Sequence, residues 1–75
     1  MNKERRGILR RIAEEHRDVH ERLTDVCEDE EYSIQNTPES LQGTDRFCEA
    51  EEALDTLCEA NESIESAIEQ ISSVI

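Results

Sequence analysis

The fold is decided by the segment SIQNTPESLQGT, residues 33–44, which separates two stretches of heptad pattern. This segment contains Pro38, the only proline, and Gly43, one of two glycines in the chain. Both residue types mark the ends of helices. Because apolar residues recur every three or four positions on either side, the sequence predicts two helices that fold back on each other at this turn. The predicted fold class is all-α, an antiparallel helical hairpin of the coiled-coil type.

The stretch after the turn has the more regular apolar stripe. Its a and d positions are Phe47, Ala50, Leu54, Leu57, Ile64, Ile68, Ile71 and Ile75. Only Asn61, at an a position, interrupts them. A stripe of this kind predicts a helix that packs along a single seam.

The stretch before the turn carries a less uniform stripe. We assign its a and d positions to Leu9, Ile12, Val19, Leu23 and Val26, with His16 at a further a position. In an antiparallel hairpin each a residue faces a d residue. The two stripes then fit in the register in which paired residue numbers add up to 80, so that Leu23 faces Leu57.

Local signals place the helix ends. Asn2 is a suitable N-cap for a first helix over residues 3–32. Thr44 or Asp45 can cap a second helix over residues 45–73. We therefore expect two helices of nearly equal length.

The connector, residues 33–44, is expected to contain one short helical turn. Thr37 is suited to cap this turn, and Gly43 to end it in a left-handed conformation. Ile34 and Leu41 would then cover the open end of the helix pair.

A hairpin of this size needs additional packing to be stable. The 75 residues form one domain, and for so small a chain apolar burial and ordering entropy nearly cancel. Further small or apolar residues flank the seam at e positions (Ala13, His20, Cys27, Ile34) and g positions (Ala53, Ala60, Ala67, Val74). We expect a homodimer in which two hairpins form a four-helix bundle. Ala53, Ala60 and Ala67 would let the second hairpin approach closely.

Asn61 has two interpretations. A buried Asn in a coiled-coil core lowers stability but fixes register and partner number, and two Asn61 side chains could meet near a dimer axis. The alternative is a solvated Asn at a loosely packed position.

The cysteines indicate a reducing environment. Cys27, Cys48 and Cys58 are odd in number, and the charged first residues contain no export signal. No apolar run has the roughly 20 residues that a membrane span requires. We therefore expect free thiols and a location in the bacterial cytoplasm.

Charge is distributed unevenly along the chain. Residues 1–22 hold seven basic and five acidic side chains, whereas residues 23–75 hold fifteen acidic side chains and only Arg46 as a base. The acidic residues expected on the surface are Glu28, Asp29, Glu30 and Glu31 before the turn, and Glu49, Glu52, Asp55, Glu59, Glu62 and Glu69 after it. Neighbours three or four positions apart are spaced about 5 Å along a helix, and phosphates recur every 3.4 Å or so along a nucleic-acid strand. The row could therefore imitate a nucleic acid, or it could simply be the solvated face of a hairpin.

His16 and His20 are spaced so that both could ligate a metal ion. In the register given above, Cys58 lies within a turn of His20 and could be a third ligand. The alternative is that both histidines are seam residues with hydrogen bonds across the interface. No motif for a metal site or for catalysis accompanies them, so we predict no metal, no cofactor and no enzymatic activity.

The turn reads NTPESLQGTDR over residues 36–46 and is followed by heptads rich in Glu and Ala. In these features the chain resembles small acidic helical-hairpin proteins of Firmicutes prophages and conjugative elements, whose turn has the pattern N-x-P-E-S-L-Q-G. The resemblance covers residues 34–75. It implies an origin in a mobile element and carries no functional residue with it.

Together these features suggest a phage- or mobile-element-encoded inhibitor of the anti-CRISPR type. Its acidic surface would bind the basic, nucleic-acid-binding surface of a host protein, without contacting nucleic acid or membrane. The alternative is a structural or scaffolding coiled coil that binds its partner through apolar faces. A dimer that senses metal is a third possibility.

Overall fold

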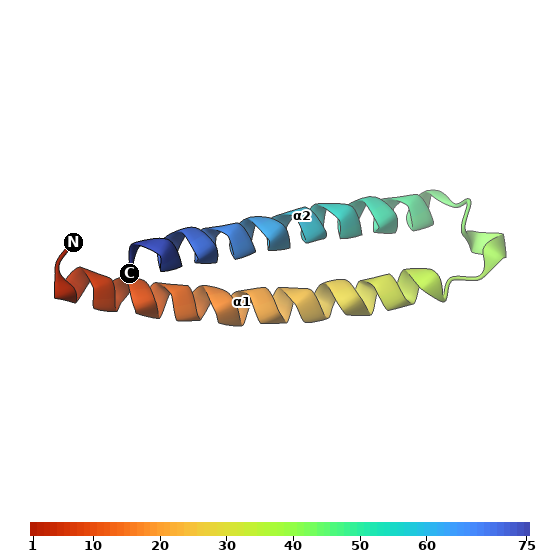
Figure 1. Ribbon diagram of the computed structural model, residues 1–75. Helices are drawn as coiled ribbons and strands as arrows, with labels where there is room; N and C mark the ends of the chain where they lie inside the picture. Colours follow the sequence, from red (N-terminus) through yellow and green to blue (C-terminus); the bar gives the residue numbers. More distant parts are fainter.

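The computed structural model describes residues 1–75 and consists of two long helices joined by a short turn (Figure 1). In chain order these are α1 (Lys3–Gln35), the 3-10 turn η1 (Glu39–Leu41) and α2 (Asp45–Val74). The helices lie antiparallel and form a rod of 59 × 15 × 13 Å. The predicted all-α hairpin is confirmed.

Both helices begin with the side-chain caps that the sequence predicts. The Asn2 Oδ1 atom accepts a hydrogen bond of 2.8 Å from the backbone N–H of Arg5. The Thr44 Oγ1 atom accepts one of 3.3 Å from the backbone N–H of Phe47. Each cap satisfies a backbone donor that has no partner within its helix.

The connector differs from the prediction in its details. α1 continues past Tyr32 to Gln35, and Thr37 donates its hydroxyl to the carbonyl of Ser33 instead of capping η1. Gly43 is not left-handed, since no residue has a positive φ. Gln42 is right-handed, and the turn is closed by a hydrogen bond from the Thr44 N–H to the Leu41 carbonyl. Ile34 is half-buried at the end of the helix pair, whereas Leu41 is 51% exposed and only borders the hollow beside Ile34 and Phe47.

The seam of α2 is the predicted one. Its half-buried residues include every predicted a and d position, namely Phe47, Ala50, Leu54, Leu57, Asn61, Ile64, Ile68, Ile71 and Ile75. Large aliphatic side chains at these positions leave the helix only one face to bury.

In α1, the residues that face α2 differ in part from the predicted ones. Val19 and Val26, assigned to d positions, are 41% and 52% exposed, whereas Ala13 and Cys27 from the predicted e row are buried. The other predicted seam residues, Leu9, Ile12, His16 and Leu23, are half-buried as expected, and His20, Thr24, Glu30 and Ile34 are half-buried beside them. The row of Leu9, Ala13, His16, His20, Leu23, Cys27, Glu30 and Ile34 also recurs at alternating steps of three and four, so periodicity permits either row. Small side chains at Ala13 and Cys27 allow the two helices to approach closely.

The register differs accordingly. The Nδ2 atom of Asn61 donates to Oγ1 of Thr24 at 2.9 Å. The His20 ring lies 3.8 Å from the Glu65 carboxylate, and Cys58 interacts with Cys27. In each pair the residue numbers add up to 85, not 80, so the helices are offset by about one turn from the predicted pairing. The predicted contacts of Asn61 with Val19 and of Cys58 with His20 are therefore wrong.

Burial in this hairpin is sparse. Ala13 and Cys27 are the only buried residues, and the chain exposes 5931 Å². Neither helix combines the length and the apolar character needed to cross a membrane.

Candidate protein-interaction surfaces

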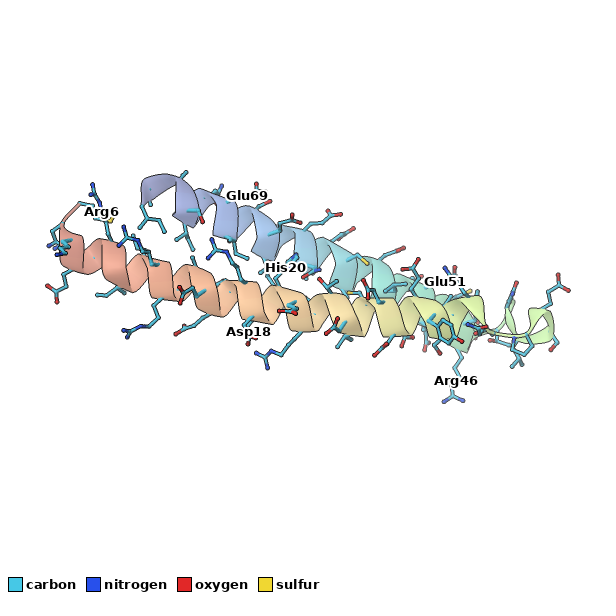
Figure 2. All side chains as sticks on the ribbon, turned by 60° about the horizontal axis from the view of Figure 1, so that its bottom comes forward. Arg6, Asp18, His20, Arg46, Glu51 and Glu69 are labelled. Atoms are coloured by element: carbon cyan, nitrogen blue, oxygen red, sulfur yellow. The ribbon has the colours of Figure 1, made fainter.

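The acidic row of α2 is fully available to a partner. Glu49, Glu52, Asp55, Glu59, Glu62 and Glu69 are all exposed. Figure 2 shows Glu69 near the end of α2 and Glu51 near its start, both extending away from the rod. None of them forms an ion pair, because the two ion pairs of the molecule are His20–Glu65 and Asp18–Arg22. The row is therefore a file of uncompensated negative charge.

Part of the acidic cluster of α1, which consists of residues 28–31, lies beside the acidic row of α2. Glu31 of α1 and Asp55 of α2 both lie close enough to Cys58 to raise the pKa of its thiol. Carboxylates from the two helices thus meet on the edge of the hairpin where Cys58 lies. We call this the acidic edge. Helical periodicity adds Glu28, Glu51, Glu62, Glu65 and Glu69 to it.

Five predicted site residues lie elsewhere. Glu52 and Glu59 are exposed on the outer face of α2, opposite its seam. Glu30 is half-buried and borders a hollow that contains Ile34 and Phe47 at the connector end of the rod. Glu49 borders a second, shallow hollow beside Ala53 and Leu57, on the other side of α2. Asp29 is exposed, and its helical position places it away from Cys58.

Glu51 and Glu65 belong to the acidic edge but were missed by the sequence analysis. Both follow a d position of α2 and therefore flank the seam. Their heptad positions would have placed them on this edge if the sequence had shown that the row of α1 with His20 and Cys27 faces inward. Glu65 lies next to His20, and this pair is the only ion-pair contact between α2 and α1.

Basic residues gather at the end of the rod that holds the two termini, opposite the connector. The guanidinium of Arg17 donates to the Ser72 hydroxyl at 3.1 Å, which places the basic half of α1 beside the end of α2. Arg46, the only base after residue 22, extends away from the rod (Figure 2). The molecule is thus basic at the end with the termini and acidic toward the connector.

Cys58 and Cys27 form a thiol pair across the seam, on the acidic edge. Cys58 is exposed, but partial loss of hydration at its thiol, the interaction with Cys27, and the carboxylates of Glu31 and Asp55 all raise its pKa above the ordinary value of 9.0. All three cysteines are free, and Cys48 is exposed. The Cys58 thiol is therefore neutral at physiological pH.

The two histidines have separate partners. The His16 ring contacts the Ile12 carbonyl through Nδ1 at 2.8 Å, so Nδ1 carries the proton in this contact. The His20 ring faces Glu65. No group of three or more His, Cys, Asp or Glu side chains is arranged to hold a metal ion.

Asn61 lies inside the hairpin seam. Its amide nitrogen bonds Thr24, whose own hydroxyl donates to the His20 carbonyl at 2.8 Å. Its Oδ1 atom is enclosed without a protein donor. Asn61 therefore pairs the two helices of one hairpin, and its position does not require a dimer axis.

The edge opposite the acidic edge is apolar. We call it the apolar flank, and it consists of Ile12, Val19 and Val26 of α1 with Ala53, Ala60, Ala67 and Val74 of α2. Val19, Val26 and Val74 are among the most exposed large apolar side chains of the molecule. The predicted alanine row belongs to this flank, with Ala53 and Ala60 exposed and Ala67 half-buried.

Comparison with known proteins gives no relative from which a function could be transferred: no family model, curated protein or solved structure matches the chain.

Proposed function

We propose that this protein is an acidic interaction protein of the kind that phages and mobile elements encode. It acts in the bacterial cytoplasm by covering the basic surface through which a host protein, such as a defence enzyme, binds nucleic acid. It works as a homodimer in a four-helix bundle, and it is an inhibitor rather than an enzyme.

The observation that carries this proposal is the unpaired state of the carboxylates. A surface that serves only solubility usually mixes both signs, which gains favourable pairs between residues four positions apart. α2 instead has Arg46 as its only base, and none of its carboxylates is paired within the helix. Unpaired like charges repel one another and destabilise the hairpin. A basic partner would relieve that repulsion.

Shape supports the same proposal. Each hairpin is a rod 59 Å long and 15 Å wide, so its carboxylates follow a narrow, extended line. Carboxylates three or four positions apart are spaced about 5 Å along its axis. Binding should therefore depend steeply on salt, as phosphate contacts do.

The test is a charge reversal with a matched control. The reversed variant carries lysine in place of Glu52, Asp55, Glu59 and Glu62. The control carries lysine in place of Glu4, Glu15, Asp18 and Asp25, which are exposed on α1 away from the acidic edge. Both changes alter the net charge equally. Each protein is used to capture binding partners from a bacterial lysate, and captured proteins are challenged with duplex DNA.

We expect wild type and control to retain a partner that DNA displaces, and the reversed variant to lose it. Circular dichroism verifies that all three remain helical. Equal capture by the reversed variant, or a partner indifferent to DNA, would contradict the mimicry.

A second candidate function is favoured by the apolar flank. A scaffolding coiled coil would bind its partner helix through Val19 and Val26, which are exposed although the seam buries smaller side chains. Salt separates the two functions, because apolar packing is not weakened between 50 and 200 mM salt whereas charge pairing is.

A further inference from the structure

The apolar flank is a continuous face without a partner inside the hairpin. Four contacts between α1 and α2 lie on the other edge: Arg17 with Ser72, His20 with Glu65, Thr24 with Asn61, and Cys27 with Cys58. On the flank itself, Val19 and Val26 remain 41% and 52% exposed. A shallow hollow next to Ala53 reaches the seam residue Leu57.

The hairpin exposes more surface than a compact protein of its mass. Its accessible surface is 5931 Å² for 8.7 kDa. A folded monomer of that mass exposes about 4,700 Å². The excess of about 1,200 Å² exceeds the roughly 800 Å² that each partner buries in a standard protein interface. Pairing two hairpins along one edge would remove an area of this size.

The placement of charge allows a second copy on this edge. The residues of α2 that border the flank on its outer side are Thr56, Ser63 and Gln70, which are uncharged, and Glu49 near the connector. The acidic edge lies on the opposite side of the seam. Two molecules that each carry a net charge of −12 can therefore meet here with most of their carboxylates directed away from each other. On α1 the flank is bordered by Glu15, Arg22 and Glu30, so charges of both signs surround it and neither a basic nor an acidic partner is selected.

We propose that the apolar flank is the face on which a second copy of this chain docks, so that two hairpins form a four-helix bundle. Val19 and Val26 pack against the partner in this bundle, and Ala53 and Ala60 allow its helices to approach closely. The acidic edges remain exposed at the outside of the dimer. This inference specifies the dimer of the proposed function but does not depend on what the acidic edge binds.

The test measures the molecular mass in solution by sedimentation equilibrium at micromolar concentration. Wild type should have twice the 8.7 kDa of one chain. The double variant Val19→Glu/Ala60→Glu places a carboxylate on each half of the flank and should raise the dimer dissociation constant at least about 100-fold, since it would bury an unpaired charge. The control Ser66→Glu adds a carboxylate to the exposed outer side of α2 and should remain a dimer.

A second variant covers the case in which the double variant unfolds. Val19→Thr/Val26→Thr keeps the shape of both side chains and changes positions that are exposed in the single hairpin, so it should remain helical while its dimer weakens. A monomeric wild type, a dimer that persists in the flank variants, or equal weakening by Ser66→Glu would overturn the proposal. The mass measurement tests the dimer independently of the charge-reversal experiment, so failure of one proposal can be distinguished from failure of the other.

Discussion

At the scale of single residues, the polar groups within the seam are the informative ones. Asn61 satisfies its amide nitrogen through Thr24 but leaves Oδ1 without a protein donor. An enclosed polar atom in that state costs about 1–3 kcal/mol. A role in fixing the register was one of two interpretations of Asn61 in the sequence analysis, and the contact with Thr24 gives that role a physical basis within one chain.

Replacing Asn61 by leucine should therefore stabilise the protein. We expect Asn61→Leu to raise the free energy of unfolding by roughly 1–2 kcal/mol, because an apolar seam residue replaces a half-satisfied one. Thermal unfolding followed by circular dichroism measures the change. Thr24→Val removes the hydrogen-bond partner while keeping side-chain shape, and should destabilise wild type but hardly affect the leucine variant. A leucine variant less stable than wild type would show that the Thr24 contact outweighs the unpaired oxygen.

Cys58 gives a pH-dependent prediction at the same scale. Its pKa is raised above 9.0 by partial loss of hydration, by Cys27 and by the nearby carboxylates of Glu31 and Asp55. Folding therefore favours the neutral thiol, and this contribution to stability is complete below about pH 9 and is lost as the pH rises through the raised pKa. Alkylation by iodoacetamide, which requires the thiolate, should begin at higher pH for Cys58 in the folded protein than for the same thiol in urea-unfolded protein. Cys27→Ala should move the Cys58 profile of the folded protein to lower pH, and an unchanged profile would contradict the pairing.

At the scale of elements, α1 and α2 differ in how strongly they specify their inward faces. α2 has Leu and Ile along one stripe and buries that stripe. α1 has two stripes of similar apolar character, one with Val19 and Val26 and one with Ala13 and Cys27. The hairpin buries the stripe with the smaller side chains and leaves the larger ones on the apolar flank.

The register can be tested through the natural thiols. In a Cys48→Ser background, oxidised glutathione should convert the Cys27 and Cys58 thiols into one intrachain disulfide while it is itself reduced to two glutathione molecules. The bond closes a long loop and should stabilise the hairpin by about 3–4 kcal/mol. Mass spectrometry and thermal unfolding measure both effects, with Cys27→Ser as the control. If the residue numbers of facing residues added up to 80, these cysteines would lie too far apart, and no such disulfide would form.

At the scale of the whole molecule, the hairpin separates its surface into regions with different tasks. One edge gathers carboxylates from both helices around Cys58, and the other is apolar. The basic residues lie at the end with the termini, where Arg17 contacts Ser72. With only two buried residues, a single hairpin has little core of its own. The docking that we propose along the apolar flank would supply the missing burial and leave the charged edge of each copy free.

The sequence by itself determined the helices, their caps, the position of the turn and the seam of α2, because each depends on neighbouring residues or on one strongly apolar stripe. It also located the acidic residues, although not the edge on which Glu31 and Asp55 come together. Only the tertiary structure decided which stripe of α1 faces inward and how far the helices are offset. Both stripes satisfy the same local periodicity, and the choice between them rests on how closely two helices can pack when Ala13 and Cys27 lie between them.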